Sequence, residues 1–309
     1  MRPIRIAILG FGKIAGDQHV PAIAGNDRFD LVATSSRSGQ GVAQTFTDWR
    51  ELICRIDGLE AVAITTPPAP RYEMARECLL AGLHCLLEKP PTAGLAEVAD
   101  LDCLAQAKGR SLFTTWHARH HPAVTAAAQA LAGKRVVSME VRWHEDVHKW
   151  HPGQNWIWDP GGFGVFDPGI NAFSIVTRIF PGSLFVESAT LYVPENAQTP
   201  IAAEVAFFSP KSNGPLAASL DWRRSEGEEW TIRIETADGI EVRLEDGGAR
   251  LFVDGEPTSE PGIGEYPDVY REFVRLIDER RSEVDVAPLR LVADCLLAGR
   301  RVAVEPVTI

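Results

Sequence analysis

The chain has 309 residues, 45% of them hydrophobic, which is enough to fill the cores of two ordinary domains and argues against disorder. Its 42 acidic side chains outnumber its 31 Lys and Arg side chains, so the formal net charge is -11. Such a charge repels nucleic acid and anionic membranes, and no long basic run offsets it, so neither partner is expected.

The apolar runs and the cysteines predict a protein that is neither secreted nor inserted into a membrane. The first apolar run, residues 4–9, is too short for a secretory signal, and no later stretch approaches a membrane span. Five cysteines make an odd number without C-x-x-C spacing, which is typical of reduced thiols in a core. The expected location is the cytoplasm.

The first 120 residues alternate short apolar runs with stretches of helical spacing, and this pattern predicts a parallel sheet. Strands are expected at residues 4–9, 31–35, 61–65, 84–87 and 111–115. The clearest helix is expected at residues 93–108, with Thr92 as its N-cap and Gly109 as its stop. We predict a doubly wound Rossmann domain for residues 1–121 that binds a dinucleotide.

After residue 121 the period changes to strict alternation, beginning at residues 137–144. Further strands are expected at residues 188–192, 202–208, 217–222, 231–236, 240–244 and 250–253, and helices at residues 267–281 and 288–301. The fold class is therefore α/β, with residues 122–309 forming a substrate-binding α+β domain around an open, mostly antiparallel sheet. The last helix can pack back on the first domain, and the open sheet face can pair subunits into a homo-oligomer.

A G-x-G-x-x-A run follows the first strand at the start of an expected helix. Gly10 permits a sharp turn, Gly12 lets the backbone approach a pyrophosphate, and Lys13 and Ile14 open the helix whose N–H groups face the anion. Glycine-rich turns also occur without a ligand, but the position directly after a first strand favours a dinucleotide site.

The end of the second strand predicts which dinucleotide binds. An NAD site places a carboxylate there for the ribose hydroxyls, whereas this chain has Ser36 and Arg37. A hydroxyl and a guanidinium can bind a 2′-phosphate, so NADP is the preferred cofactor, with NAD possible as well. The alternative is that Arg37 is an ordinary surface arginine.

Ligands of open parallel sheets bind beyond the carboxyl ends of the strands, where Thr66, Pro67, Glu88 and Lys89 are found. We assign Thr66, Pro67 and Glu88 to the cofactor site. Lys89 is followed by two prolines that restrict the backbone, and its ammonium can project toward a substrate oxygen. The alternative is a lysine that extends along the surface into solvent.

Asp167 and Asn171 follow a glycine-rich segment and lie four residues apart in a helical stretch. This spacing puts both on one helix face, where both can reach one sugar hydroxyl. Asp167 precedes Pro168, so an N-cap followed by a proline at the first helical position explains the pair equally well.

Together, the glycine loop, Glu88-Lys89-Pro90 and the D-x-G-x-N run of 167–171 resemble the Gfo/Idh/MocA oxidoreductase family over essentially the whole chain. The segments at 149–158 and 166–171 resemble members that act on L-arabinose or D-galactose at C1. Many members have His where this chain has Asn171, so the resemblance does not supply a histidine base. It does imply a sugar held between the nicotinamide and the second sheet, with the following residues binding it: His117, Glu145, Trp150 and His151.

These expectations define a reaction: an aldose such as galactose or arabinose loses a C1 hydride to the cofactor and becomes an aldonolactone. Asp167 accepts the hydroxyl proton directly or through water, Asn171 orients that hydroxyl, and Lys89 stabilises the developing negative charge. This hypothesis requires the ammonium and the carboxylate to reach the same sugar oxygen.

Three alternatives remain. Residues 144–148 match the H-E-x-x-H zinc pattern, but the alternation before them predicts a strand rather than the helix that zinc needs, so no metal is expected. A dinucleotide-binding regulator of the same fold is disfavoured by Lys89 and Asp167. The family's inositol and glucose-fructose oxidoreductases are disfavoured by Asn171.

Overall fold

The computed structural model describes residues 2–258 and 262–308, which divide into two compact units. The first unit contains the described residues up to His117 together with Ile263–Val286, and the second contains the remaining described residues. The segment Ile263–Val286 thus groups with the first unit, which differs from the predicted division at residue 121. Whether the units bind cofactor and substrate as predicted stays a prediction.

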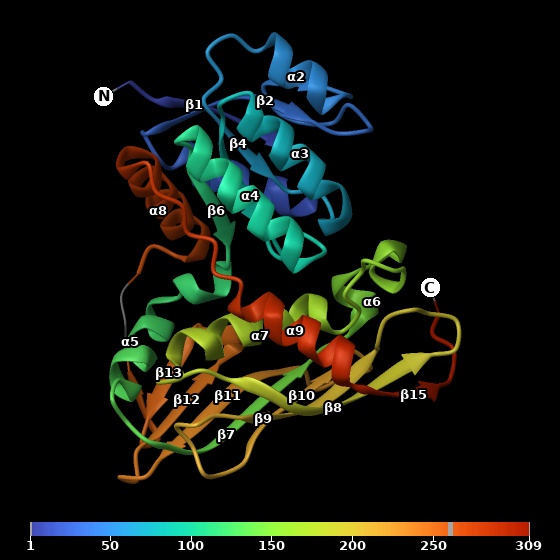
Figure 1. The fold of residues 1–309 in the computed structure, drawn as a ribbon, viewed down its shortest axis with the longest axis vertical. Coiled ribbons are helices and arrows are strands. Elements are labelled where there is room, and N and C mark those ends of the chain that lie inside the picture. Colours follow the sequence, from blue (N-terminus) through green and yellow to red (C-terminus); the bar gives the residue numbers. More distant parts are fainter. Residues whose placement is uncertain (1, 259–261, 309) are drawn as a thin grey trace. The chain divides into compact units, whose positions relative to one another are not determined.

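The first unit is built on a six-stranded parallel sheet with the strand order β3-β2-β1-β4-β5-β6 (Figure 1). All five predicted strands are present, and the sequence missed a sixth, β3, which is only three residues long with its first two exposed. The strands are β1 (Ile4–Leu9), β2 (Phe29–Ser35), β3 (Gln44–Phe46), β4 (Ala61–Ile64), β5 (His84–Glu88) and β6 (Leu112–Thr115).

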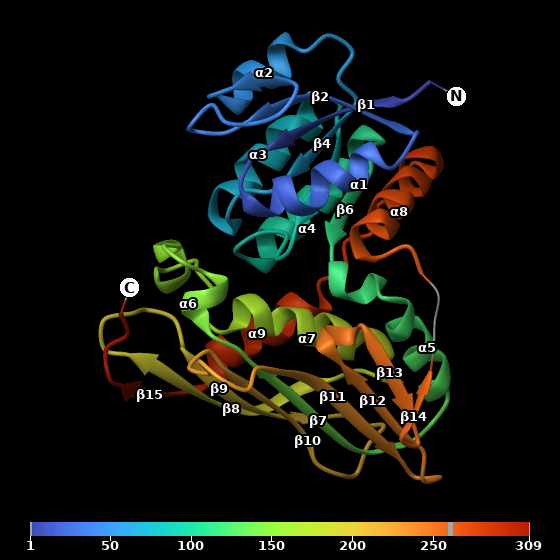
Figure 2. The ribbon, with the colours of Figure 1, turned by 180° about the vertical axis from the view of Figure 1, so that it is seen from behind.

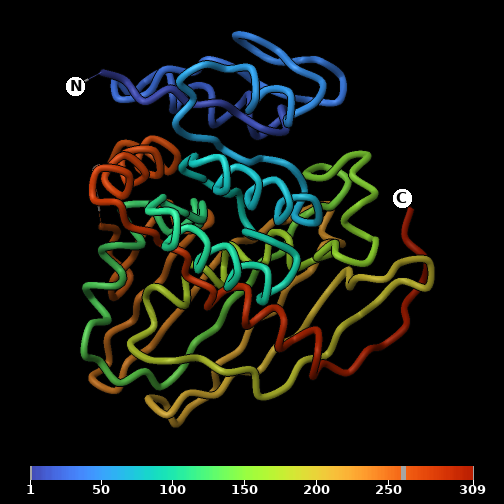
Figure 3. Tube along the Cα trace, turned by 45° about the horizontal axis from the view of Figure 1, so that its top comes forward, coloured from blue at the N-terminus to red at the C-terminus, as the bar shows by residue number. Residues whose placement is uncertain are grey.

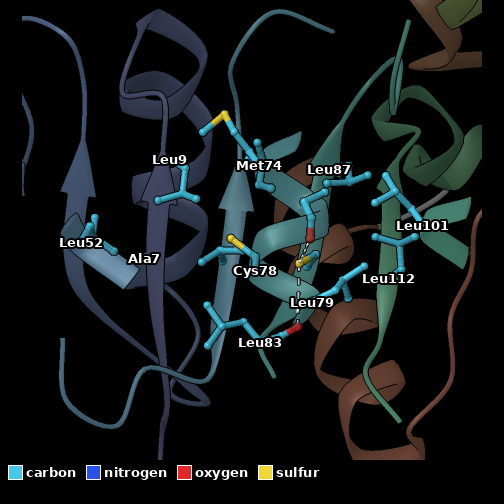
Figure 4. Close-up of a cluster of buried hydrophobic side chains, with 14 of the residues drawn as sticks. Ala7, Leu9, Leu52, Met74, Cys78, Leu79, Leu83, Leu87, Leu101 and Leu112 are labelled. Atoms are coloured by element: carbon cyan, nitrogen blue, oxygen red, sulfur yellow. Dashed lines mark hydrogen bonds between the residues drawn. The ribbon is translucent and has the colours of Figure 1, made fainter. Parts of the chain in front are cut away.

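Successive side chains along each strand point to opposite faces of this sheet, and both sets belong to a hydrophobic core. Helices therefore cover both faces. Ala7 and Leu9 of β1 belong to the core cluster drawn in Figure 4, whereas Ile6 and Ile8 face the opposite cluster. The first cluster is covered by α2 (Trp49–Arg55), α3 (Pro68–Leu80) and α4 (Leu95–Lys108), and the second by α1 (Val20–Ala24) and α8 (Glu265–Glu279), as Figure 2 shows.

The predicted helix of residues 93–108 is α4, but its predicted N-cap is wrong. Gly94 is the N-cap, and its N–H donates to the Glu97 carboxylate at 3.2 Å. Thr92 lies two residues earlier, where its hydroxyl donates to the Gly94 carbonyl. Gly109 ends the helix at φ 61°, as predicted, because glycine adopts this left-handed conformation without a steric penalty.

The second unit contains a nine-stranded, mostly antiparallel sheet in the order β14-β13-β12-β11-β7-β10-β9-β8-β15. Among the described strands of this sheet, only the β7–β10 and β8–β15 pairs are parallel. One face is covered by α5 (Pro122–Leu131), α7 (Phe166–Ile179) and α9 (Ala287–Ala298), as Figures 1 and 2 show. The strands are β7 (Val136–His144), β8 (Phe185–Pro194), β9 (Ala202–Phe208), β10 (Leu216–Asp221), β11 (Glu229–Thr236), β12 (Glu241–Glu245), β13 (Arg250–Val253), β14 (Glu256–Thr258) and β15 (Arg300–Val304).

The predicted final helix of residues 288–301 is too long. It ends at Ala298, and after Gly299 the chain becomes β15, which pairs with β8. Figure 3 traces this last, red part of the chain to the C-terminus. Short helices complete the described chain: η1 (Ala15–His19), η2 (His117–His120), α6 (Val147–Trp150), η3 (Asn155–Trp158) and η4 (Asp246–Gly248).

Two of the five cysteines do not fit the prediction of core thiols. All five are free, but Cys54 and Cys103 are exposed, on α2 and α4, and only the other three are buried. Across residues 2–258 and 262–308, no helix combines the length and apolar character that a membrane crossing requires.

Candidate active site

The glycine loop has the geometry that its sequence predicts. Gly10 has a φ of 100°, and a Cβ there would lie 2.5 Å from the Thr66 methyl group, so only glycine fits. A Cβ at Gly12 would meet no atom closer than 4.0 Å, which leaves open space beside the loop backbone. This space suits the close approach of a pyrophosphate. Lys13 and Ile14 follow, both exposed, and Lys13 forms an ion pair with Asp17.

The helix after the loop differs from expectation, because it continues from residue 15 as a π-helix, η1, that leads into α1. Pro21 has no N–H to donate, so the ordinary i to i−4 ladder is interrupted there. The π-helix ends at His19, whose side chain is fully buried.

The segment after β2 presents a cation. Ser36 is held in a turn, since its hydroxyl donates to the Gln40 carbonyl at 2.6 Å. Arg37 is exposed and forms no ion pair with any residue in the described part of the chain. Its guanidinium is therefore available to an anion from solution.

Arg71 connects the loops that follow β4 and β5. Its guanidinium is buried and donates to the carbonyls of Thr66, Glu88 and Pro90. Pro67, next to Thr66, caps α3. The predicted cofactor residues of these two loops are thus held by one side chain, which the sequence analysis did not single out.

Glu88 is the centre of a buried hydrogen-bond network. Its Oε1 accepts from Tyr266 at 2.8 Å and from His19 Nε2 at 3.1 Å, and its Oε2 accepts from the Lys89 backbone N–H at 2.9 Å. Burial alone raises the pKa of Glu88, but the hydrogen bonds from His19 and Tyr266, together with charge interactions with His19 and His117, outweigh it and lower the pKa to about 2. The carboxylate is therefore ionised at neutral pH. The next peptide bond, Lys89–Pro90, is cis.

His117 lies in the same unit and contacts the start of α8. Its Nδ1 is 3.0 Å from the Glu265 carboxylate, and its ring stacks on Tyr266 at 5.5 Å between centroids. Tyr266 therefore contacts both Glu88 and His117. Neither Tyr266 nor His19 was predicted as a site residue.

In the second unit, Asp167 and Asn171 share one face of α7. The N-cap of this helix is Val165, so the alternative in which Asp167 is the cap is wrong. Asp167 is 5% exposed, and its Oδ2 lies 3.6 Å from His151 Nε2. The Asn171 Oδ1 is buried without a hydrogen-bond partner among the described residues. A buried acceptor of this kind is costly unless a donor, such as a ligand hydroxyl, reaches it.

Glu145 is enclosed by tryptophans. The indole N–H of Trp222 donates to Oε1 at 3.1 Å, and that of Trp230 donates to Oε2 at 2.8 Å. Trp222 also packs against His151, with ring centroids 5.0 Å apart. Neither tryptophan was predicted as a site residue, although Trp222 ends the strand predicted at residues 217–222 and Trp230 directly precedes the one predicted at 231–236. Trp150 is 46% exposed and contacts Trp230 edge-on.

The structure excludes the helical geometry of the zinc alternative. His144 ends strand β7, whereas His148 lies in the four-residue helix α6. Within the described ranges, no group of three or more His, Cys, Asp or Glu side chains is placed to hold a metal ion. A cavity of about 500 Å³ in the second unit is lined partly by Trp222, but by none of the predicted site residues.

Comparison with known proteins assigns the family. Residues 4–115 match the model of the Gfo/Idh/MocA oxidoreductase family with an NAD-binding Rossmann fold. Over 307 residues, 99% of each chain, the protein is 46% identical to galactose 1-dehydrogenase of Pseudomonas fluorescens. The chain belongs to the Gfo/Idh/MocA oxidoreductase family.

Solved structures of this oxidoreductase fold agree with the architecture. D-Galactose-1-dehydrogenase from Rhizobium etli superimposes with a TM-score of 0.94 at 48% identity, covering 100% of this chain and 99% of that one. A 3-ketoreductase from Actinomadura kijaniata, solved with TDP-benzene and NADP, has a TM-score of 0.82 at 17% identity and covers 98% and 99% of the two chains. At this lower identity the likeness extends to the fold alone.

Proposed function

We propose that this protein oxidises an aldopyranose, D-galactose above all and L-arabinose as a second substrate, at C1 to the aldonolactone. The observation that carries the proposal is the full-length similarity to galactose 1-dehydrogenase. We also propose that the protein is cytoplasmic and that it forms a homo-oligomer through the open face of the second sheet.

Roles for the three catalytic residues follow from their chemistry. Asp167 is buried and accepts the proton of the anomeric hydroxyl, directly or through water. Asn171 orients that hydroxyl, and its unpartnered Oδ1 accepts a sugar hydrogen bond. Lys89 stabilises the negative charge that develops on the oxygen as the C1–H bond breaks. The bound dinucleotide supplies the acceptor for the C1 hydride.

The substrate-binding roles of the remaining residues are part of the same proposal. His117, Trp150 and His151 contact the sugar, and Glu145 acts at least partly by holding the indoles of Trp222 and Trp230. Aromatic rings bind the apolar face of a pyranose, while imidazole nitrogens bind its hydroxyls.

NADP is the proposed cofactor in preference to NAD. The support is the exposed Arg37 guanidinium after β2, and the fact that neither Ser36 nor Arg37 supplies the carboxylate that an NAD site uses. Gly10, Gly12, Lys13, Ile14, Thr66, Pro67 and Glu88 complete the proposed cofactor site.

A spectrophotometric screen of aldoses with NADP and with NAD tests the function. We expect turnover of galactose and arabinose, with a higher kcat/KM for NADP. Lys89→Ala and Asp167→Ala should each lower kcat by about 10²–10⁴-fold, whereas the exposed controls Lys108→Ala and Asp57→Ala should not. Wild-type turnover in both site variants would contradict the assigned roles.

The same screen separates the enzyme from the regulator alternative. Purified protein that binds NADPH but reduces no NADP with any aldose would support a dinucleotide sensor. Arg37→Ala should lower kcat/KM for NADP and leave that for NAD within about twofold, since only the 2′-phosphate contact is removed.

A further inference from the structure

The first turn of α8 contacts two residues assigned to the site. The Tyr266 side chain is 3% exposed, its hydroxyl donates to Glu88 Oε1 at 2.8 Å, and its ring lies nearly parallel to the His117 imidazole, at 18°. The preceding residue, Glu265, lies with its Oε1 3.0 Å from His117 Nδ1. Two neighbouring side chains of one helix therefore reach two different site residues.

Tyr266 acts on Lys89 through Glu88. The Glu88 carboxylate accepts hydrogen bonds from Tyr266, from His19 and from the Lys89 backbone N–H. A buried carboxylate with several donors cannot rotate without leaving at least one of them unpaired, which is costly. The carboxylate therefore holds the Lys89 backbone, from which the ammonium side chain starts, in one position.

The direction of the Tyr266 hydrogen bond stays the same over the working pH range. Burial, followed by the charge of Glu88, raises the pKa of Tyr266 well above its usual value, so this hydroxyl remains a donor. Glu88 has a pKa of about 2, so it remains an acceptor. Tyr266 therefore remains the donor and Glu88 the acceptor, and neither group gains or loses a proton over this range.

Glu265 acts on His117 instead. A carboxylate accepts hydrogen bonds only, so the contact places a proton on Nδ1 of the imidazole. In the neutral ring this leaves Nε2 as a hydrogen-bond acceptor, which suits the O–H donor of a sugar. Without Glu265, the ring would be free to exchange its two tautomers.

We propose that Glu265 and Tyr266 are positioning residues with separate effects. Tyr266 aligns Lys89 through Glu88 and so serves the chemical step, whereas Glu265 sets the tautomer of His117 and so serves sugar binding. This inference rests on the proposed function, because it names the residues that support that site. It also gives a role to the segment Ile263–Val286, which joins the first unit after the chain has passed through the second.

Tyr266→Phe removes one hydroxyl and keeps the ring on His117. We expect kcat to fall by about tenfold, because the loss of a hydrogen bond to a charged group costs at least about a factor of ten. The KM for galactose should stay within about twofold. Tyr72→Phe is the control. It also removes a hydroxyl that donates to a carboxylate, that of Asp100 at 2.9 Å, but this pair is exposed and joins α3 to α4. Equal losses of kcat in the two variants would overturn the role of Tyr266.

Glu265→Ala should show the opposite pattern, with the KM for galactose about tenfold higher and kcat within about twofold of wild type. Glu265→Gln should restore most of the binding, because its amide oxygen accepts the same Nδ1–H. A loss of kcat at unchanged KM in Glu265→Ala, or no recovery in Glu265→Gln, would overturn the role of Glu265.

A measurement without sugar separates this proposal from the proposed function. Nitrogen NMR of the eight histidines, with His117 assigned by the His117→Gln variant, should show the Nδ1–H tautomer in wild type and a mixture in Glu265→Ala. Identical His117 spectra in the two proteins would overturn the tautomer proposal. Wild-type protein that oxidises no aldose would instead overturn the proposed function.

Discussion

His84 is a residue whose titration couples pH to stability without involving the proposed site. It begins β5, at the opposite end of the strand from Glu88, and its Nδ1 accepts from the Ser111 backbone N–H at 3.0 Å. Burial, assisted by the nearby Arg110 cation, lowers the pKa of His84 from 6.5 to about 4. The folded protein therefore holds this imidazole neutral under conditions in which the unfolded chain would protonate it.

This difference predicts a loss of stability on acidification. Between pH 6.5 and 4 the unfolded chain binds more protons than the folded protein, so the free energy of unfolding falls as pH falls, and the His84 contribution levels off below pH 4. At pH 5 the loss relative to pH 7 amounts to about 2 kcal/mol. Glu88 adds a separate loss only below about pH 4.5, where its own carboxyl begins to titrate in the unfolded chain.

Urea unfolding at pH 7 and pH 5 measures this contribution. His84→Asn retains an oxygen acceptor for the Ser111 N–H but does not titrate, so its stability should change less between the two pH values than that of the wild type. An equal change in the two proteins would show that His84 is not responsible.

At the scale of elements, the turn between α9 and β15 has no room for a side chain. A Cβ at Gly299 would lie 2.4 Å from the Cys295 carbonyl oxygen and 3.0 Å from Leu191 Cγ. Cys295 belongs to α9 and Leu191 to β8, so the helix, the turn and strand β8 meet at this residue. The absence of a side chain lets β15 pair with β8 directly after the helix ends.

Gly299→Ala should therefore destabilise the protein by about 1–3 kcal/mol, as overpacking of a buried contact does. The midpoint of urea unfolding measures the effect. Gly16→Ala is the control, because a Cβ there would meet only Phe11 Cζ at 3.9 Å. A midpoint for Gly299→Ala that matches the control would mean that the turn relaxes at little cost.

At the scale of the whole molecule, the chain crosses between its two units three times, because Ile263–Val286 returns to the first. The returning helix α8 buries six side chains there: Tyr266, Val269, Tyr270, Phe273, Val274 and Leu276. At about 1.5–3 kcal/mol each, their burial contributes roughly 9–18 kcal/mol before the entropy cost of ordering the helix, which is similar in size to the net stability of an ordinary domain.

A fragment of residues 1–121, the predicted Rossmann domain, should consequently not fold stably. We expect it to bind a hydrophobic dye and to lack a cooperative thermal transition. Joining residues 263–286 to this fragment through a flexible linker should restore the transition. A cooperative transition in the shorter fragment would show that α8 is dispensable for the first unit.

Local sequence patterns were sufficient for most of the elements and for the type of fold. The parallel sheet, the antiparallel sheet, Gly10 and the Gly109 helix stop were all predicted, because periodicity and left-handed glycines depend on neighbouring residues only. The family was also predicted, since its motifs are short contiguous segments. The assigned roles of Lys89, Asp167 and Asn171 stay predictions.

Long-range packing decided what these patterns could not. The buried contacts of His19, the pairing of β15 with β8, the return of α8 and the tryptophans around Glu145 all involve partners far along the chain, and a short window of sequence does not contain them. Helix and strand periods report which side chains are buried, but not which distant surface buries them. Residue type and spacing therefore indicated the family in advance, whereas the hydrogen-bond partners of Glu88 and His117 became visible only in the folded chain.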